Sequence, residues 1–152
     1  MAKQSAGILL YRLRAGEPEV LLVHPGGPFW ARKDGGAWSI PKGEYEEGDD
    51  PRAAALREFE EETGRPLEAG ELAALGKIKQ RGGKVVTAWA AAGDLDPASI
   101  TSNTFELEWP PRSGRMREFP EVDRAQWFAL AEARTKILPA QEELLDRLLE
   151  RL

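Results

Sequence analysis

The sequence predicts a fold of the α/β or α+β class with a mixed sheet at its centre. Two observations lead to this prediction. Apolar runs of strand length fill much of the first third of the chain and return after residue 70, and two other stretches repeat apolar side chains at helical spacing. Because the strand patterns and the helix patterns do not alternate regularly along the chain, they favour a mixed sheet. The length of 152 residues indicates one domain spanning residues 1–152.

The composition, 41% hydrophobic and 31% charged, is typical of a water-soluble globular protein. The chain has no cysteine, which excludes disulfides and thiolate metal sites. No apolar run is long enough to cross a membrane, and the N-terminus lacks signal-peptide flanks, so we expect a cytoplasmic protein without a membrane partner. A net charge of -5 argues against a nucleic-acid partner, and the sequence makes no prediction of oligomeric state.

The first elements expected along the chain are two strands, residues 5–13 and 19–24, joined by a turn with glycine and proline. A loop rich in glycine and proline follows at 25–36, and residues 37–41 form a short strand or extended piece. His24, the only histidine, ends the second strand, where we expect a structural role or a surface position.

Residues 51–63 are expected to form a helix. Asp50 is a suitable N-cap, Pro51 fits the first helical position, and Gly64 fits the C-terminal stop. The apolar side chains that would face the sheet are Ala55, Leu56 and Phe59.

After this helix, strands are expected at 72–80 and 84–92, paired around a glycine-rich turn. Residues 103–109 and 122–130 indicate two further strands joined by a polar loop. The C-terminal residues 140–152 are expected to form an amphipathic helix. Its apolar stripe comprises Leu144, Leu145, Leu148, Leu149 and Leu152.

The segment 43–64 carries nine acidic side chains, although carboxylates repel one another. On the expected helix, Glu58, Glu61 and Glu62 are spaced i, i+3 and i+4 and therefore share one face. Hard divalent cations such as Mg²⁺ and Mn²⁺ take oxygen ligands of this kind and would reverse the repulsion. Arg57 lies beside the cluster and could hold one carboxylate by a charge-assisted hydrogen bond. A solvated acidic face is the simpler interpretation, but it leaves the preceding glycine-rich turn and helix cap unexplained.

This stretch closely resembles the Nudix box, the signature of the Nudix hydrolases. The pattern of the box is G-x5-E-x7-R-E-U-x-E-E-x-G-U, where U is a bulky aliphatic residue. Asp49 replaces one glutamate of the pattern, and Arg65 replaces its last apolar residue, whose packing Leu67 could provide. The residues at the required positions are Gly43, Arg57, Glu58, Phe59, Glu61, Glu62 and Gly64.

The resemblance implies an α/β fold, namely an α/β/α sandwich around a central mixed sheet. It also implies hydrolysis of a nucleoside diphosphate linked to another group X, with Mg²⁺ or Mn²⁺ as the cofactor. By position, Glu58, Glu61 and Glu62 would bind metal, and the Gly43 carbonyl could add a ligand. Arg57 would orient a glutamate, so we predict Arg57, Glu58 and Glu61 as catalytic residues. Divalent cations suit this chemistry because they neutralise and align the oxygens of a pyrophosphate.

A general base near the attacking water would contribute a rate factor of about 10²–10⁴. In related enzymes this base is either a box glutamate or a glutamate on a later loop. The later loop of this chain contains Glu118 and Glu121, and Glu121 is the first choice for the base. A solvated loop acid is an equally simple interpretation of either residue.

The tripeptide 41–43, Pro-Lys-Gly, resembles the variant seen in Nudix hydrolases of dinucleoside polyphosphates, diphosphoinositol phosphates and some nucleoside triphosphates. Lys42 would then bind a phosphate of the substrate. Trp30 and Trp38 bracket the loop before the box and are predicted to stack a nucleobase. Two tryptophans in apolar strands are predicted to belong to the core: Trp89 and Trp127.

The predicted function is metal-dependent hydrolysis of a pyrophosphate bond in a small phosphorylated substrate, either a dinucleoside polyphosphate or a nucleoside triphosphate. Diphosphoinositol polyphosphate and the 5′ end of RNA are alternative substrates. A non-catalytic Nudix module that senses a nucleotide is an alternative of another class. Such modules often lack box glutamates, whereas all three are present here, which favours an enzyme.

Overall fold

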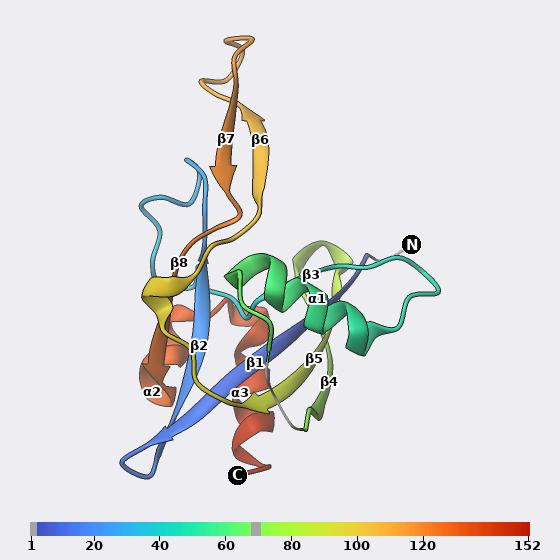
Figure 1. The fold of residues 1–152 in the computed structure, drawn as a ribbon, viewed down its shortest axis with the longest axis vertical. Helices are drawn as coiled ribbons and strands as arrows, with labels where there is room; N and C mark the ends of the chain where they lie inside the picture. Colours follow the sequence, from blue (N-terminus) through green and yellow to red (C-terminus); the bar gives the residue numbers. More distant parts are fainter. Residues whose placement is uncertain (1–2, 68–70) are drawn as a thin grey trace.

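The computed structural model describes residues 3–67 and 71–152 and has a mixed sheet at its centre (Figure 1). The strands follow the order β4-β5-β1-β2-β8, with β3 paired to β1. Their bounds are β1 Gln4–Arg14, β2 Glu17–Pro25, β3 Lys42–Glu44, β4 Ala73–Lys79, β5 Val85–Ala92 and β8 Val122–Ala129. β1 and β5 run parallel, whereas the other neighbouring pairs are antiparallel. The predicted mixed sheet is confirmed.

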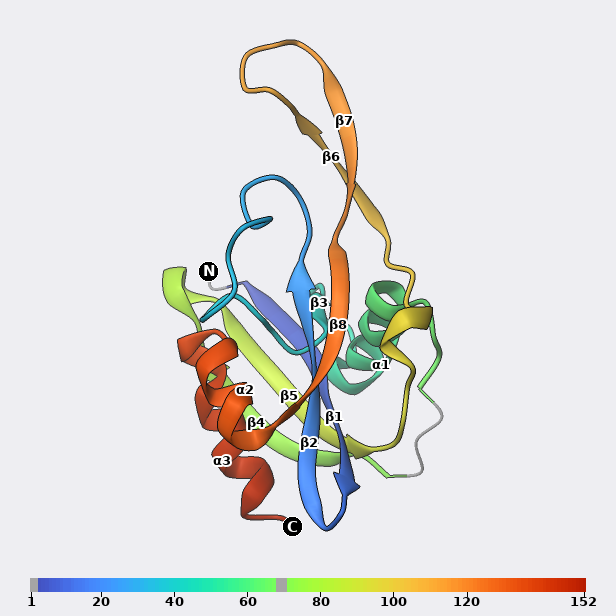
Figure 2. The same cartoon turned by 90° about the vertical axis from the view of Figure 1, so that its left-hand side faces the viewer.

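Helices cover both faces of the sheet, which confirms the predicted α/β/α sandwich (Figure 2). Each face has its own apolar layer, because successive side chains of a strand point to opposite sides. Ile8 packs with Phe59 beneath the first helix, whereas the next strand residue, Leu9, packs beneath the other two. The helices are α1 (Pro51–Thr63), α2 (Leu130–Lys136) and α3 (Glu142–Leu149).

The ends of α1 are set by local chemistry. Asp50 Oδ2 accepts a hydrogen bond of 3.2 Å from a backbone N–H of the first turn, and Pro51 begins the helix. Gly64 adopts a left-handed conformation with φ 74°, and its N–H donates to the Glu60 carbonyl at 2.7 Å. The predicted range of 51–63 therefore matches the helix at both ends.

A two-stranded hairpin projects from the sandwich (Figure 1). It consists of β6 (Thr104–Glu108) and β7 (Met116–Pro120), which pair antiparallel. The prediction of a loop at 110–121 is wrong for β7. This strand forms because it finds β6 as a partner, with Phe119 opposite Phe105, and a mostly polar segment gives no such signal by itself.

The C-terminal region differs from the prediction in two respects. Residue 130 begins the unpredicted helix α2 rather than ending β8. The last helix ends at Leu149, and Leu149 and Leu152 are 42% and 52% exposed, so neither belongs to the apolar layer. The leucines of the predicted stripe that are buried are Leu144, Leu145 and Leu148. None of the helices in the described part of the chain has both the length and the apolar character needed to span a bilayer.

Candidate active site

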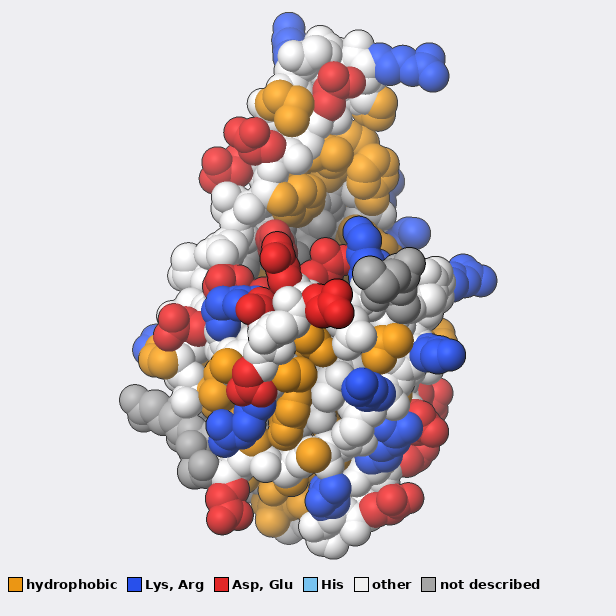
Figure 3. Space-filling model, turned by 90° about the vertical axis from the view of Figure 1, so that its right-hand side faces the viewer, with side chains coloured by type: hydrophobic (Ala, Val, Ile, Leu, Met, Phe, Trp, Pro, Cys, Tyr) orange, Lys and Arg blue, Asp and Glu red, His pale blue; other side chains and the backbone are white. Residues whose placement is uncertain are grey.

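The box meets a later part of the chain in a pocket of about 410 Å³, which we call the acidic pocket. In Figure 3, acidic side chains gather at the base of the projecting hairpin. The three box glutamates, Lys42 and Gly43 line this pocket. Glu121, the first choice for the general base, lines it as well. The complete lining is Ser5, Lys42, Gly43, Glu44, Glu58, Glu61, Glu62, Lys84, Asn103 and Glu121.

Pairing of β3 with β1 places the start of the box against α1. Gly43 lies opposite Ala6 of β1. A Cβ atom at position 43 would lie 2.0 Å from Oε2 of Glu58, so glycine is what leaves room for the Glu58 carboxylate. Close packing of β3 and α1 therefore sets where this carboxylate lies.

Arg57 contacts two of the box glutamates. Its Nη2 donates to Glu58 Oε1 at 3.4 Å, and its Nε lies 3.9 Å from Glu61 Oε1. Burial raises the pKa of Glu58, nearby Glu61 raises it further, and Arg57 opposes the change. Arg57 is thus placed where the sequence predicts a residue that orients the carboxylates.

Glu62 is the box glutamate whose charge is least favoured by its surroundings. Burial raises the pKa of Glu62 to about 8, with Lys42 opposing this effect and Glu121 and Glu58 adding to it. The backbone N–H of Lys42 donates to Glu62 Oε2 at 3.3 Å. Burial also lowers the pKa of the Lys42 ammonium group, which Glu62 counteracts. Added positive charge in the acidic pocket would therefore stabilise the Glu62 carboxylate.

Without metal, the protein is expected to lose stability as pH rises. Native Glu62 keeps its proton up to a pKa of about 8, whereas the unfolded chain releases it near the ordinary value of 4.5. Between these values the native state binds more protons, so the free energy of unfolding falls by about 2–5 kcal/mol as pH rises. Urea unfolding in EDTA across this pH range measures the change. Glu62→Gln should remove this dependence and the exposed control Glu60→Gln should retain it, and equal slopes in both variants would contradict the prediction.

Glu121 is joined to the box by a relay of backbone hydrogen bonds. The Asn103 N–H donates to the Glu61 carbonyl at 2.9 Å, and the Glu121 N–H donates to the Asn103 carbonyl at 2.8 Å. The Glu121 carbonyl in turn accepts the Gly26 N–H at 2.9 Å. A Cβ at position 26 would lie 2.0 Å from the Pro120 carbonyl oxygen, so this approach requires glycine. The relay holds Glu121 between α1 and the loop after β2.

Glu118, the second choice for a base, lies on β7 opposite Glu106. This pair points away from the hairpin face that carries Phe105 and Leu107, because adjacent side chains of a strand alternate between faces. The acidic pocket is lined by Glu121 and not by Glu118. The placement therefore favours Glu121.

Trp30 and Trp38, which were predicted to stack a nucleobase, have different surroundings. Trp38 is 2% exposed and packs edge-on against Phe128, with ring centroids 5.0 Å apart. Its prediction as a substrate-binding residue is wrong, because its backbone pairs with Ile137 after α2 and carries the ring into the core. Trp30 is 37% exposed and lines an apolar cleft that also includes Glu121.

Other predicted positions agree with the structure. Trp89 and Trp127 are partly buried against the apolar layer beneath α1. His24 is fully buried and structural: its Nδ1 lies 2.9 Å from Asp123 Oδ1, and its Nε2 lies 2.6 Å from the Lys33 carbonyl oxygen. These contacts tie β2 to β8 and to the loop before the box.

The acidic pocket also contains residues that were not predicted from the sequence. Lys84 directly precedes β5, whose parallel pairing with β1 brings it beside the pocket. The glycine-rich turn before it, η1 (Arg81–Gly83), is a signal that marks the start of this strand. Asn103 has no such signal, because it joins Glu61 and Glu121 through its backbone.

The donors of the acidic pocket suit a hard divalent cation. Carboxylate oxygens are the ligands that Mg²⁺ and Mn²⁺ prefer. Burial and neighbouring carboxylates raise the pKa values of Glu58 and Glu62, so a bound cation would stabilise the charged form of both groups. Within residues 3–67 and 71–152, no three acidic or histidine side chains converge closely enough to enclose an ion. The box glutamates fit a cation by chemistry and by position on one wall, and their side chains would have to turn toward it.

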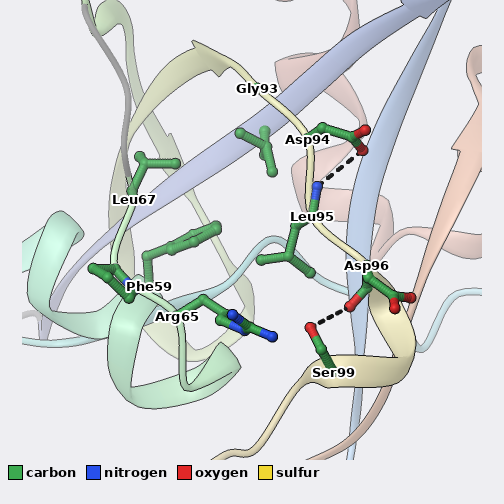
Figure 4. A pocket seen from close by; sticks show the side chains of 10 residues that line it. Phe59, Arg65, Leu67, Gly93, Asp94, Leu95, Asp96 and Ser99 are labelled. Atoms are coloured by element: carbon green, nitrogen blue, oxygen red, sulfur yellow. Dashed lines mark hydrogen bonds between the residues drawn. The ribbon is translucent and has the colours of Figure 1, made fainter.

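A larger pocket of about 570 Å³ lies at the C-terminal end of α1 (Figure 4). Phe59 and Leu67 line it, and Leu67 packs against the apolar layer beneath α1. Leu67 thus provides the packing expected from the last residue of the box pattern, while Arg65 is exposed. This pocket has no lining residue in common with the acidic pocket.

Sequence comparisons identify relatives of this chain. A family model described as NUDIX domain matches residues 1–148. A Mycobacterium tuberculosis protein, provisionally named 8-oxo-dGTP diphosphatase 3, is 30% identical over 143 residues, which are 90% of this chain and 63% of that protein. An RNA pyrophosphohydrolase of Roseobacter denitrificans is 58% identical over 38 residues, 25% of this chain and 24% of that protein. The matches cover less than two thirds of the length of either relative.

Solved structures share the fold. A C. elegans Ap4A hydrolase in a binary complex has a TM-score of 0.68 at 23% identity, covering 99% of this chain and 97% of that chain. The NUDIX domain of Shewanella oneidensis NrtR, complexed with ADP ribose, has a TM-score of 0.67 at 17% identity, covering 99% and 88%. The family model spans almost the whole chain, and the box occupies the helix and pocket described above. The chain therefore belongs to the Nudix family.

Proposed function

We propose that this chain hydrolyses a pyrophosphate bond in a nucleoside diphosphate linked to another group, in a reaction that requires Mg²⁺ or Mn²⁺. The observation that carries the proposal is the meeting of Glu58, Glu61 and Glu62 with Glu121 in one pocket. A divalent cation, when bound, supplies charge that neutralises phosphate oxygens. The three box glutamates would hold the cation, with the Gly43 carbonyl as a further oxygen donor.

Other residues of the pocket would position the substrate and move the proton. Lys42 and Lys84 line the pocket and would bind phosphate oxygens. Arg57 keeps Glu58 oriented. The carboxylate of Glu121 would accept a proton from the attacking water while the water oxygen bonds to phosphorus and the bridging P–O bond breaks.

The proposed substrate is a dinucleoside polyphosphate or a nucleoside triphosphate. The Mycobacterium tuberculosis relative, whose name states a nucleoside triphosphate as its substrate, supports this class. The exposed ring of Trp30 near Glu121 is suitably placed for a base. The net charge of -5 weighs against the 5′ end of RNA, although the Roseobacter relative is named for that activity.

A substrate panel tests the proposal. It contains diadenosine tetraphosphate, common and oxidised nucleoside triphosphates, ADP-ribose, a diphosphoinositol polyphosphate and 5′-triphosphorylated RNA, each with Mg²⁺, Mn²⁺ or EDTA. We expect phosphate-linked products from a nucleotide with metal and none in EDTA. Tight nucleotide binding without turnover of any compound would indicate a nucleotide-sensing module instead.

Gly43→Ala is expected to lower kcat/KM by about 10²-fold, because Glu58 must turn away from the new methyl group. The clashing atoms are the end of a flexible side chain, so the free energy of unfolding should change by no more than about 1 kcal/mol. Steady-state kinetics and urea unfolding measure the two effects. Gly35→Ala is the matched control, since its Cβ would make an ordinary contact at 3.4 Å. Full activity of Gly43→Ala would contradict this role of the glycine.

A further inference from the structure

An apolar cleft of about 370 Å³ adjoins the acidic pocket, and we call it the hairpin cleft. The loop after β2 contributes Phe29 and Trp30, and the hairpin contributes Phe105 and Leu107. Glu121 lines both the hairpin cleft and the acidic pocket, so the two lie side by side. Figure 3 shows hydrophobic side chains on the hairpin directly above the acidic cluster.

We propose that the hairpin cleft binds the nucleobase of the substrate whose phosphates occupy the acidic pocket, and that β6 and β7 are the elements that determine substrate specificity. This inference rests on the proposed function. It assigns Phe105 a specificity-determining role together with Trp30.

The aromatic side chains of the cleft are exposed yet held in place. Phe29 and Trp30 are 60% and 37% exposed, and neighbouring exposed aromatic residues on a folded protein mark a binding site. The Phe29 ring lies edge-on to Trp109 of the hairpin, with centroids 5.5 Å apart. Lys33 Nζ lies 4.9 Å from the centroid of the Trp30 ring. These contacts order the rings before a ligand arrives, which lowers the entropic cost of binding.

The walls of the cleft are held at a fixed separation. Gly27 has φ +94°, and a Cβ there would lie 3.0 Å from Cζ of Phe105, so the loop backbone approaches the edge of this ring closely. The adjacent Gly26 N–H donates to the Glu121 carbonyl. The loop after β2 therefore contacts both the proposed nucleobase site, through Gly27, and the segment that carries Glu121, through Gly26.

The two faces of the hairpin differ in charge. Arg117 lies opposite Leu107 and thus on the cleft face, where its guanidinium carbon is 5.6 Å from the centroid of the Phe119 ring. The opposite face carries the acidic residues Glu106, Glu108 and Glu118. An anionic ligand with an aromatic group is therefore complementary to the cleft face alone.

This chemistry discriminates between the candidate substrates. A nucleobase can stack on Phe105 or Trp30, and base–aromatic stacking contributes about 10- to 100-fold in affinity per base. A diphosphoinositol polyphosphate has no aromatic ring to place in the cleft. The cleft therefore favours a nucleotide.

Phe105→Ala tests the inference with two substrates, diadenosine tetraphosphate and inorganic tripolyphosphate, which lacks a base. We expect KM for the nucleotide to rise about 10- to 100-fold, while kcat/KM for tripolyphosphate stays unchanged. Phe105→Leu keeps an apolar side chain of similar bulk but has no ring, so it guards against loosening of the hairpin by alanine. This variant should likewise raise KM for the nucleotide and leave kcat/KM for tripolyphosphate unchanged. Met116→Ala is the matched control, because Met116 is 59% exposed on the opposite face of the hairpin. Equal losses for both substrates, or no loss for either, would overturn the proposal.

Binding of AMP separates failure of the cleft from failure of the proposed function, because AMP has a base but no pyrophosphate bond. AMP is expected to quench tryptophan emission, and Trp30→Phe should remove the quench while retaining the affinity measured by calorimetry. AMP binding that depends on Phe105, without turnover of any compound, would support the cleft and overturn only the hydrolase. If AMP bound with the same affinity to Phe105→Ala and still quenched the emission of Trp30→Phe, the assignment of the cleft to a nucleobase would be overturned. A wild-type dimer that dissociates in Phe105→Ala, measured by light scattering, would assign the cleft to a second copy of the chain.

Discussion

Glu62→Gln is expected to lower kcat by about 10³-fold while the native fold is retained. Glutamine keeps the size of the side chain, and its amide oxygen can still accept the Lys42 N–H. The variant removes one of the three negative charges proposed to hold the cation. Because burial already disfavours this charge, as the pKa of about 8 shows, its removal should not destabilise the metal-free protein.

Glu60→Gln is the matched control for this variant. Glu60 is on the same helix, is exposed and lies outside the acidic pocket, so we expect wild-type activity. Turnover as a function of Mg²⁺ concentration, together with a thermal unfolding curve for each variant, makes the comparison. Wild-type turnover and metal dependence in Glu62→Gln would show that this carboxylate takes no part in cation binding.

Glu121→Gln is expected to lower kcat by about 10²–10⁴-fold with little change in KM. The backbone relay from Glu61 through Asn103 does not involve the Glu121 side chain, so the site should keep its geometry. Steady-state kinetics with the substrate identified by the panel measure this result.

Glu118→Gln is the control for the base, because Glu118 is close in sequence but lies on the hairpin face away from the cleft. We expect its kcat to match the wild type. If Glu121→Gln kept its rate, the base would have to be a box glutamate. Both carboxylates are on the same segment, so a difference between the two variants reports where each side chain lies and not the loss of a negative charge as such.

The helix of the box was predictable to the residue because its determinants are local. Asp50, Pro51 and Gly64 set its ends through contacts within one turn. The shared face of Glu58 and Glu62 follows from helical periodicity alone. Strands such as β1 and β2 were predictable for a related reason, since each is an apolar run bounded by turn residues.

Elements that depend on distant partners were missed. β3 has three residues and forms because Gly43 pairs with Ala6. β7 forms against β6, and α2 is a single short helix with no side-chain cap. Segments of this length lack enough periodicity to indicate their structure without the partner.

The carboxylate face, the oxygen chemistry suited to a cation and the family membership all follow from residues close together along the chain. The arrangement around that face depends on long-range pairing. Trp30 and Trp38 are both tryptophans flanking one loop, yet only the backbone pairing with Ile137 draws Trp38 into the core. Glu121 meets the box because Asn103 joins it to the end of α1, a contact between segments far apart in sequence that no local pattern encodes.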